Sequence, residues 1–166
     1  MKKYFFSVFL LFVVLISSGQ GSLPVGKAQL NLGLGLSNWG VPVYTGIDFG
    51  IAKNLTLGGE LSFRSYNEKW KDNRYRHSII GISGNLNYHF NTVLKIPVKY
   101  DLYAGINVGY YNWRSPNGYG GSYNSAAGIG GQIGGRYYFS NKVGLNLEFG
   151  GGNAFANGKI GLTIKL

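Results

Sequence analysis

Apolar residues alternate with small or polar residues, with a period of two, in eight separate stretches between residue 28 and the C-terminus. Leu alternates with Asn and Gly over 30–36, and Val, Leu and Phe alternate with Gly, Asn and Glu over 143–150. Successive side chains of a β-strand point to opposite faces of the sheet, so this pattern predicts strands and excludes helices. We expect strands over 28–37, 41–51, 55–66, 77–90, 99–113, 125–139, 143–151 and 158–166.

Short and long connections alternate between these strands. The three-residue connections after residues 51 and 139 would pair Ile51 with Leu55 and Phe139 with Val143, whereas 67–76, 114–124 and 152–157 are longer and polar. Connection 91–98 is the one longer segment at the end of the barrel where the other connections are short turns. An even number of strands with short turns at one end and long loops at the other is the plan of an outer-membrane barrel with both termini in the periplasm.

The first residues have the pattern of a secretory leader. Lys2 and Lys3 precede an apolar run over 4–16, and small residues follow up to Gly19. This run of about 13 residues falls short of the ~20 that a membrane-spanning helix needs, so it predicts a cleavable signal peptide over 1–19. Cleavage after Ala28 is the alternative site. We expect a short segment, 20–27, and then a single barrel domain, 28–166.

The composition of the two faces indicates which one points outward. A soluble lipocalin-like barrel would place Lys and Glu outside and its apolar face inside. Here the polar face consists of Gly, Asn, Ser, Thr and Tyr with a few charges, and its small residues suit a narrow lumen. Aromatic residues lie near the strand ends of the apolar face. Rings in such positions form girdles at the membrane interfaces. We therefore expect the apolar face to contact lipid.

With these features, 28–166 resembles the OmpA-like and OmpX-like small outer-membrane β-barrels. The most telling stretch is the aromatic and glycine-rich segment 100–110 (YDLYAGINVGY). The resemblance implies an all-β fold, an eight-stranded antiparallel up-and-down transmembrane β-barrel, in the outer membrane of a Gram-negative cell. It also implies insertion by the barrel-assembly machinery. That family usually ends in an aromatic residue, whereas this chain ends in Leu166.

Charge narrows the choice of partners. The chain has 16 basic and 6 acidic residues, but the cations are scattered in loops and at strand ends, which disfavours a nucleic-acid binder. Alternation directs several charges into the lumen, where they must be paired or wetted. We expect a lumen ion-pair network of Asp48, Glu60, Arg64, Asp101, Arg136, Glu148 and Lys165. Arg136 would lie across from Asn146 and pair diagonally with Glu148. The alternative is a gated, narrow ion path.

The connection 67–76 mixes cations with aromatic rings. Such a loop could contact lipopolysaccharide phosphates or another anion, or it could be an ordinary solvated loop. The candidate contact residues are Lys69, Trp70, Lys71, Arg74, Tyr75 and Arg76. Connection 114–124, with Tyr119 and Tyr123, could form a contact surface for another protein or cell.

The sequence offers little for catalysis. Only two histidines are present, His77 beside Ser78 and His89 near the other end of its strand, and the His-x-Ser spacing of lipid A deacylases is missing. Without cysteine, two separated histidines make no metal-ligand cluster. We expect a monomer without enzymatic activity, cofactor or metal, with a structural or surface-interaction role in contact with outer-membrane lipid and lipopolysaccharide. A small pore and a lipid A-modifying enzyme are the alternatives.

Overall fold

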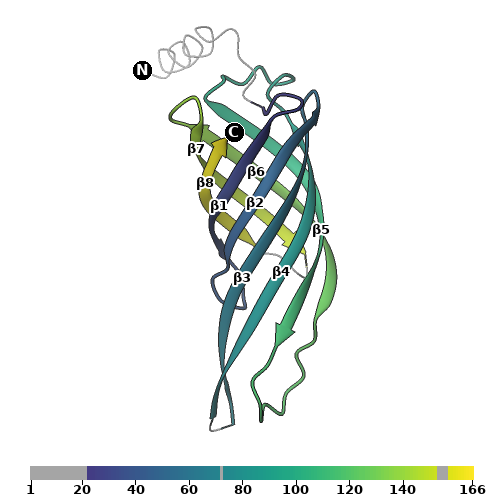
Figure 1. Cartoon of the computed structure of the whole chain (residues 1–166), viewed down its shortest axis with the longest axis vertical. Helices are drawn as coiled ribbons and strands as arrows, with labels where there is room; N and C mark the ends of the chain where they lie inside the picture. Colours follow the sequence, from purple (N-terminus) through teal and green to yellow (C-terminus); the bar gives the residue numbers. More distant parts are fainter. Residues whose placement is uncertain (1–21, 72, 153–156) are drawn as a thin grey trace, which may run out of the picture.

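The chain folds into one closed β-barrel whose strands are neighbours in chain order (Figure 1). The computed structural model describes residues 22–71, 73–152 and 157–166, so the signal peptide expected over 1–19 lies outside the described residues. The strands are β1 (Ala28–Leu36), β2 (Val43–Ala52), β3 (Leu55–Trp70), β4 (Asn73–His89), β5 (Tyr100–Arg114), β6 (Ala126–Tyr138), β7 (Val143–Gly152) and β8 (Gly158–Lys165).

Every strand pairs antiparallel with the next, and β1 closes the barrel against β8, where Gln29 lies opposite Lys165. This confirms the expected all-β, eight-stranded, up-and-down fold. The C-terminus lies at the same end as the short turns, whereas the β3–β4 hairpin and the β5–β6 connection extend from the opposite end (Figure 1). We call this opposite end the loop end. Among the described residues no helix is long and apolar enough to cross a membrane.

The barrel is apolar outside and polar inside. Outward side chains such as Ile129 and Ile133 are 72% and 62% exposed, whereas Gln29, Asn87 and Asp101 in the lumen are fully buried. A soluble barrel would have the reverse distribution, because water-facing surfaces carry polar groups and cores are apolar. The expected outward direction of the apolar face is therefore confirmed.

Exposed aromatic rings border the apolar exterior at both ends. Tyr88, Tyr100 and Tyr137 lie toward the turn end, and Phe63 and Tyr110 lie toward the loop end. Tyr88 is opposite Leu55 on β3, eight residues before Phe63. This separation corresponds to about 26 Å along the strand, and to about 20 Å across the barrel wall for a strand tilt near 40°. The band has the height of a thin hydrocarbon layer between two aromatic girdles.

The largest departure from the expected strands concerns residues 67–76. Residues 67–70 and 73–76 are not a loop: β3 and β4 continue through them as a paired hairpin, with Lys69 opposite Arg74 and Trp70 opposite Asn73. In the barrel wall, apolar and polar residues alternate because one face of each strand points toward lipid. This hairpin extends past the apolar band, where neither face does. Its strands therefore continue without the hydrophobic pattern that identified them elsewhere.

The turns at the other end follow the expected register with one change. Phe139 N–H donates to Val143 C=O, and Arg136 lies opposite Asn146, as expected. Leu55, however, pairs with Ala52, because the register shifts between Gly50 and Ala52 and leaves a two-residue turn. The long connection between β4 and β5 is compact, since Leu94 N–H donates to Phe90 C=O and Ile96 N–H to Asn91 C=O.

Candidate functional site

Arg136 lies at the centre of the lumen and joins two buried carboxylates. Its Nη1 donates to Asp101 Oδ2 at 3.1 Å and its Nη2 to Asp48 Oδ2 at 2.8 Å. The other oxygen of Asp101 lies 2.7 Å from His89 Nδ1, and Asn31 Nδ2 donates to Asp48 at 2.9 Å. These groups come from β1, β2, β4, β5 and β6, so the network ties strands from both sides of the barrel together.

A second cluster forms around Lys159, which the sequence analysis missed although it shares the strand parity of Lys165. Its Nζ lies 2.8 Å from Glu60 Oε2 and 2.9 Å from Glu148 Oε1. The expected Arg136–Glu148 pair is wrong: Arg136 contacts Asp48 and Asp101 instead. The Tyr103 ring lies 4.4 Å from the Arg136 guanidinium, and its hydroxyl donates to Glu148 at 2.8 Å, so the phenol occupies the space between them.

The two remaining predicted lumen residues lie toward opposite ends of the barrel. Arg64 Nη1 donates to Ser37 Oγ at 2.9 Å near the loop end. Lys165 lies near the turn end, where its Nζ is 3.9 Å from the centre of the Tyr138 ring. The network is therefore two linked ionic clusters in the middle of the lumen, with a further cation toward each end.

Little free space remains between these side chains. The polar cavity that reaches Asp48, Glu60 and Arg136 has a volume of about 10 Å³, close to the minimum for one water molecule. Glycines on the inner face make this packing possible: a Cβ on Gly134 would overlap the Tyr103 ring. The charged groups thus fill the lumen at this level.

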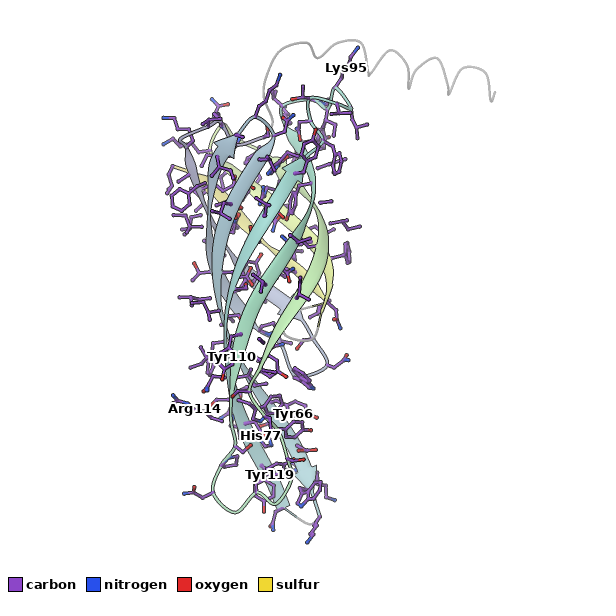
Figure 2. All side chains as sticks on the ribbon, turned by 90° about the vertical axis from the view of Figure 1, so that its right-hand side faces the viewer. Tyr66, His77, Lys95, Tyr110, Arg114 and Tyr119 are labelled. Atoms are coloured by element: carbon purple, nitrogen blue, oxygen red, sulfur yellow. The ribbon has the colours of Figure 1, made fainter. Side chains whose placement is uncertain are left out.

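A buried aromatic cluster that the sequence analysis did not find lies at the loop end of the barrel. Ile79, Tyr111 and Trp113 are buried there, with Trp39, Tyr66, Tyr123 and Ala126 packed against them. His77 is fully buried beside this cluster. Figure 2 shows Tyr66, His77 and Tyr119 together at the end opposite Lys95. The alternation along β4 and β5 already indicates that Ile79, Tyr111 and Trp113 point inward. An apolar cluster was nevertheless not expected there, because the inner face in the middle of the barrel is polar.

The β3–β4 hairpin and the β5–β6 connection are bound together through Glu68. Its carboxylate accepts the hydroxyl of Tyr119 at 2.7 Å and that of Tyr123 at 3.1 Å, and Tyr75 Oη donates to Gly118 C=O at 3.0 Å. Desolvation, with the adjacent Glu68 carboxylate, raises the pKa of Tyr119 to about 12, and the same causes raise the pKa of Tyr123. The two segments form one unit at the mouth of the barrel.

The six predicted lipid-contact residues separate onto the two faces of the hairpin. Lys69, Arg74 and Arg76 have the outward parity of Phe63 and Ile80, and all three are exposed. Trp70 and Tyr75 face the other way, with ring centroids 5.7 Å and 5.2 Å from that of Tyr119. Lys71 is exposed in the turn, with a positive φ of 52°.

Arg114 adds a fourth cation to the outward face. It is exposed at the end of β5 and lies opposite Ser78, two residues beyond the outward Ile80. Lys69, Arg74, Arg76 and Arg114 thus form a continuous basic face on β3, β4 and β5, directly beyond the apolar band. Among the described residues, no group of three or more His, Cys, Asp or Glu side chains is placed to hold a metal ion.

Comparison with known proteins identifies the fold. No protein-family model matches the chain, and no curated protein matches its sequence. The structure is similar to that of the outer membrane protein OprG from Pseudomonas aeruginosa, with a TM-score of 0.67 at 10% identity, covering 89% of this chain and 99% of OprG. It is also similar to Neisserial surface protein A, with a TM-score of 0.58 at 12% identity and coverage of 84% and 94%.

A third similar structure is Ail of Yersinia pestis in complex with the heparin analogue sucrose octasulfate. The TM-score is 0.53 at 9% identity, over 86% of this chain and 96% of Ail. At these identities the likeness concerns the arrangement of the backbone. The chain has the fold of the small eight-stranded outer-membrane β-barrel proteins.

Proposed function

We propose that this chain is an integral outer-membrane barrel with a structural or surface-interaction role, whose basic outer face binds lipopolysaccharide phosphates. The apolar exterior with its two girdles supports the membrane position, because soluble monomers rarely expose so large an apolar surface, whereas a transmembrane barrel presents an apolar band flanked by aromatic girdles. The filled lumen favours this role over that of a pore. The short turns and the C-terminus would face the periplasm, and the loop end would face outward.

The basic face carries the proposal of phosphate binding. Arg114 lies opposite Ser78, which is about 7 Å along β4 from the outward Ile80 in the direction of the loop end. Lys69 lies about 20 Å along β3 from Phe63 in the same direction. With a strand tilt near 40°, the cations occupy the layer from about 5 to 15 Å above the apolar band, where lipid headgroups lie. Guanidinium groups bind phosphate through paired, charge-assisted hydrogen bonds.

The orientation can be tested with single cysteines, because the chain contains none. Asn117→Cys lies in the exposed β5–β6 connection, and Asn141→Cys lies in the exposed β6–β7 turn. A membrane-impermeant maleimide added to intact cells should label only the first variant, and both should react after lysis. Labelling of Asn141→Cys alone in intact cells would invert the proposed orientation.

Phosphate binding can be tested with two variants of equal charge. In one, the basic-face residues Lys69, Arg74, Arg76 and Arg114 are replaced by Ser; in the control, Lys53, Lys95, Lys99 and Lys142 at the turn end are replaced by Ser. Binding of labelled lipopolysaccharide to the barrel in detergent micelles should weaken only in the first variant. The difference should shrink from 0.1 M to 1 M salt, since the screening length falls from about 10 Å to about 3 Å.

Sucrose octasulfate separates recognition of the anion from insertion of acyl chains, because it is a polyanion without lipid. It should compete with lipopolysaccharide for the native barrel and for the turn-end control, and compete poorly for the basic-face variant. Equal loss of binding in the two charge variants would show that net charge is sufficient and would refute a localised site.

A further inference from the structure

His77 has a defined protonation pattern at Nδ1. The Trp113 indole nitrogen lies 3.1 Å from this atom, and Ser115 Oγ lies 3.0 Å from it. An indole N–H can only donate, so Nδ1 must carry the lone pair, and a neutral imidazole then holds its proton on Nε2. With no proton on Nδ1, the hydrogen of the Ser115 hydroxyl is the one that points toward the imidazole. This is the arrangement in which histidine can act as a base toward serine.

The other side of the ring faces a carboxylate. His77 Nε2 is buried without a hydrogen-bond partner and lies 3.6 Å from Glu68 Oε2. Glu68 is held in place by the hydroxyls of Tyr119 and Tyr123, which donate to its two oxygens. A carboxylate facing the second imidazole nitrogen orients the ring and stabilises its protonated form. The sequence analysis considered only Ser78 beside His77, whereas folding brings Ser115 to it from the end of β5.

From this geometry we propose that Ser115, His77 and Glu68 form a nucleophile–base–carboxylate triad that accepts acyl groups from carboxylic esters at the outer surface. This activity goes beyond the proposed structural role and departs from the non-enzymatic expectation. Ser115 and His77 are the catalytic residues, and Glu68 is a positioning residue, whereas the Trp113 indole N–H shares the Nδ1 lone pair with Ser115. Ser115 is exposed while His77 is fully buried, so the nucleophile is reachable from solvent and lies at the edge of the pocket that holds its base.

The reaction balances with water as the only co-reactant. Ser115 Oγ forms a bond to the ester carbonyl carbon while its proton moves to His77 Nδ1. The ester C–O bond then breaks, and the alcohol leaves with that proton. Water next attacks the acyl-serine, again with His77 as base, and the products are a carboxylic acid and an alcohol.

A fluorophosphonate probe tests the nucleophile, because it forms a stable adduct with activated serines. The native barrel in detergent micelles should give one adduct per chain, which peptide mass spectrometry should place on Ser115. Ser115→Ala should abolish it, and Ser122→Ala, at another exposed serine of the same connection, should retain it. No adduct under conditions that label a known serine hydrolase, or an adduct at another residue, would overturn the proposal.

Variants around the imidazole separate catalysis from folding, which heat-modifiable gel migration monitors in each case. His77→Gln should slow labelling about 100-fold or more, in the usual range for loss of a general base. Trp113→Phe removes the second donor to Nδ1 and should speed labelling while keeping a ring in the cluster. Unchanged labelling in folded His77→Gln, or slower labelling in folded Trp113→Phe, would refute the role of Nδ1.

Glu68→Gln provides a second route should His77→Gln not fold. Among the described residues, the titratable side chains in direct contact with His77 are Glu68, Tyr66, Tyr119 and Tyr123, and Glu68 is the only carboxylic acid of that set. Loss of its charge should move the midpoint of the labelling rate against pH to lower pH, since the protonated imidazole loses its stabilising carboxylate. A purely structural role would lower the rate without moving the midpoint.

Discussion

Arg136→Met removes the charge that joins two buried carboxylates while keeping a long side chain in the lumen. Asp48 and Asp101 are 2% and 0% exposed, and breaking a buried ion pair typically costs about 3–5 kcal/mol because a charge is left uncompensated. Each carboxylate keeps another partner, Asn31 Nδ2 at 2.9 Å and His89 Nδ1 at 2.7 Å. We therefore expect a loss near the lower end, about 3 kcal/mol.

The assay is reversible urea unfolding of the barrel in lipid vesicles, followed by tryptophan fluorescence. Asp101→Asn combined with Arg136→Met should recover part of the loss and give a coupling energy of about 1 kcal/mol or more, because the two side chains are in contact. Glu148→Gln combined with Arg136→Met should couple more weakly, since Glu148 reaches Arg136 only through Tyr103. Coupling to Glu148 that equals or exceeds coupling to Asp101 would refute the assigned pairs.

Three further outcomes test other parts of the barrel. Leu147→Arg, on the lipid-facing exterior, should cost about 2–4 kcal/mol in the same assay if it lies near the bilayer midplane. Gly134→Ala should cost about 1–3 kcal/mol, because its Cβ would overlap the Tyr103 ring, whereas Gly151→Ala, which meets no atom within 4 Å, should be nearly neutral. Tyr119 holds its proton more tightly in the folded state than its ordinary pKa of about 10 allows, so its contribution to stability should be complete below about pH 10 and lost as pH rises toward about 12. Tryptophan fluorescence should follow this alkaline loosening of the loop end, and Tyr119→Phe should reduce it.

The wall of the barrel was predictable because each of its residues contacts either lipid or the lumen. That two-sided environment produces the period of two, and the small polar residues of one face are sufficient to place it inward. Beyond the apolar band this constraint ends, so the extension of β3 to Trp70 and of β4 from Asn73 left no hydrophobic pattern to detect. The outward direction of Lys69, Arg74 and Arg76 follows only once that extension is known.

Strand register alone does not predict which side chains meet across the lumen. Register places Arg136 beside Asn146, but a guanidinium on a long side chain reaches Asp48 on β2, far from β6 around the barrel. The Tyr103 ring over Gly134 decides which carboxylates remain available to it, and that depends on three-dimensional packing. Lys159, by contrast, could have been included from its parity with Lys165 alone.

The pairing of β1 with β8 has a consequence for how the molecule is made. The first and last strands form one seam, in which Gln29 lies opposite Lys165 and Leu166 N–H donates to Ala28 C=O. Loop closure over nearly the whole chain is entropically costly and makes such a contact slow to form. Until it forms, both edge strands carry unpaired backbone groups that can join other chains. The nascent chain must therefore be kept from aggregating until its last strand arrives.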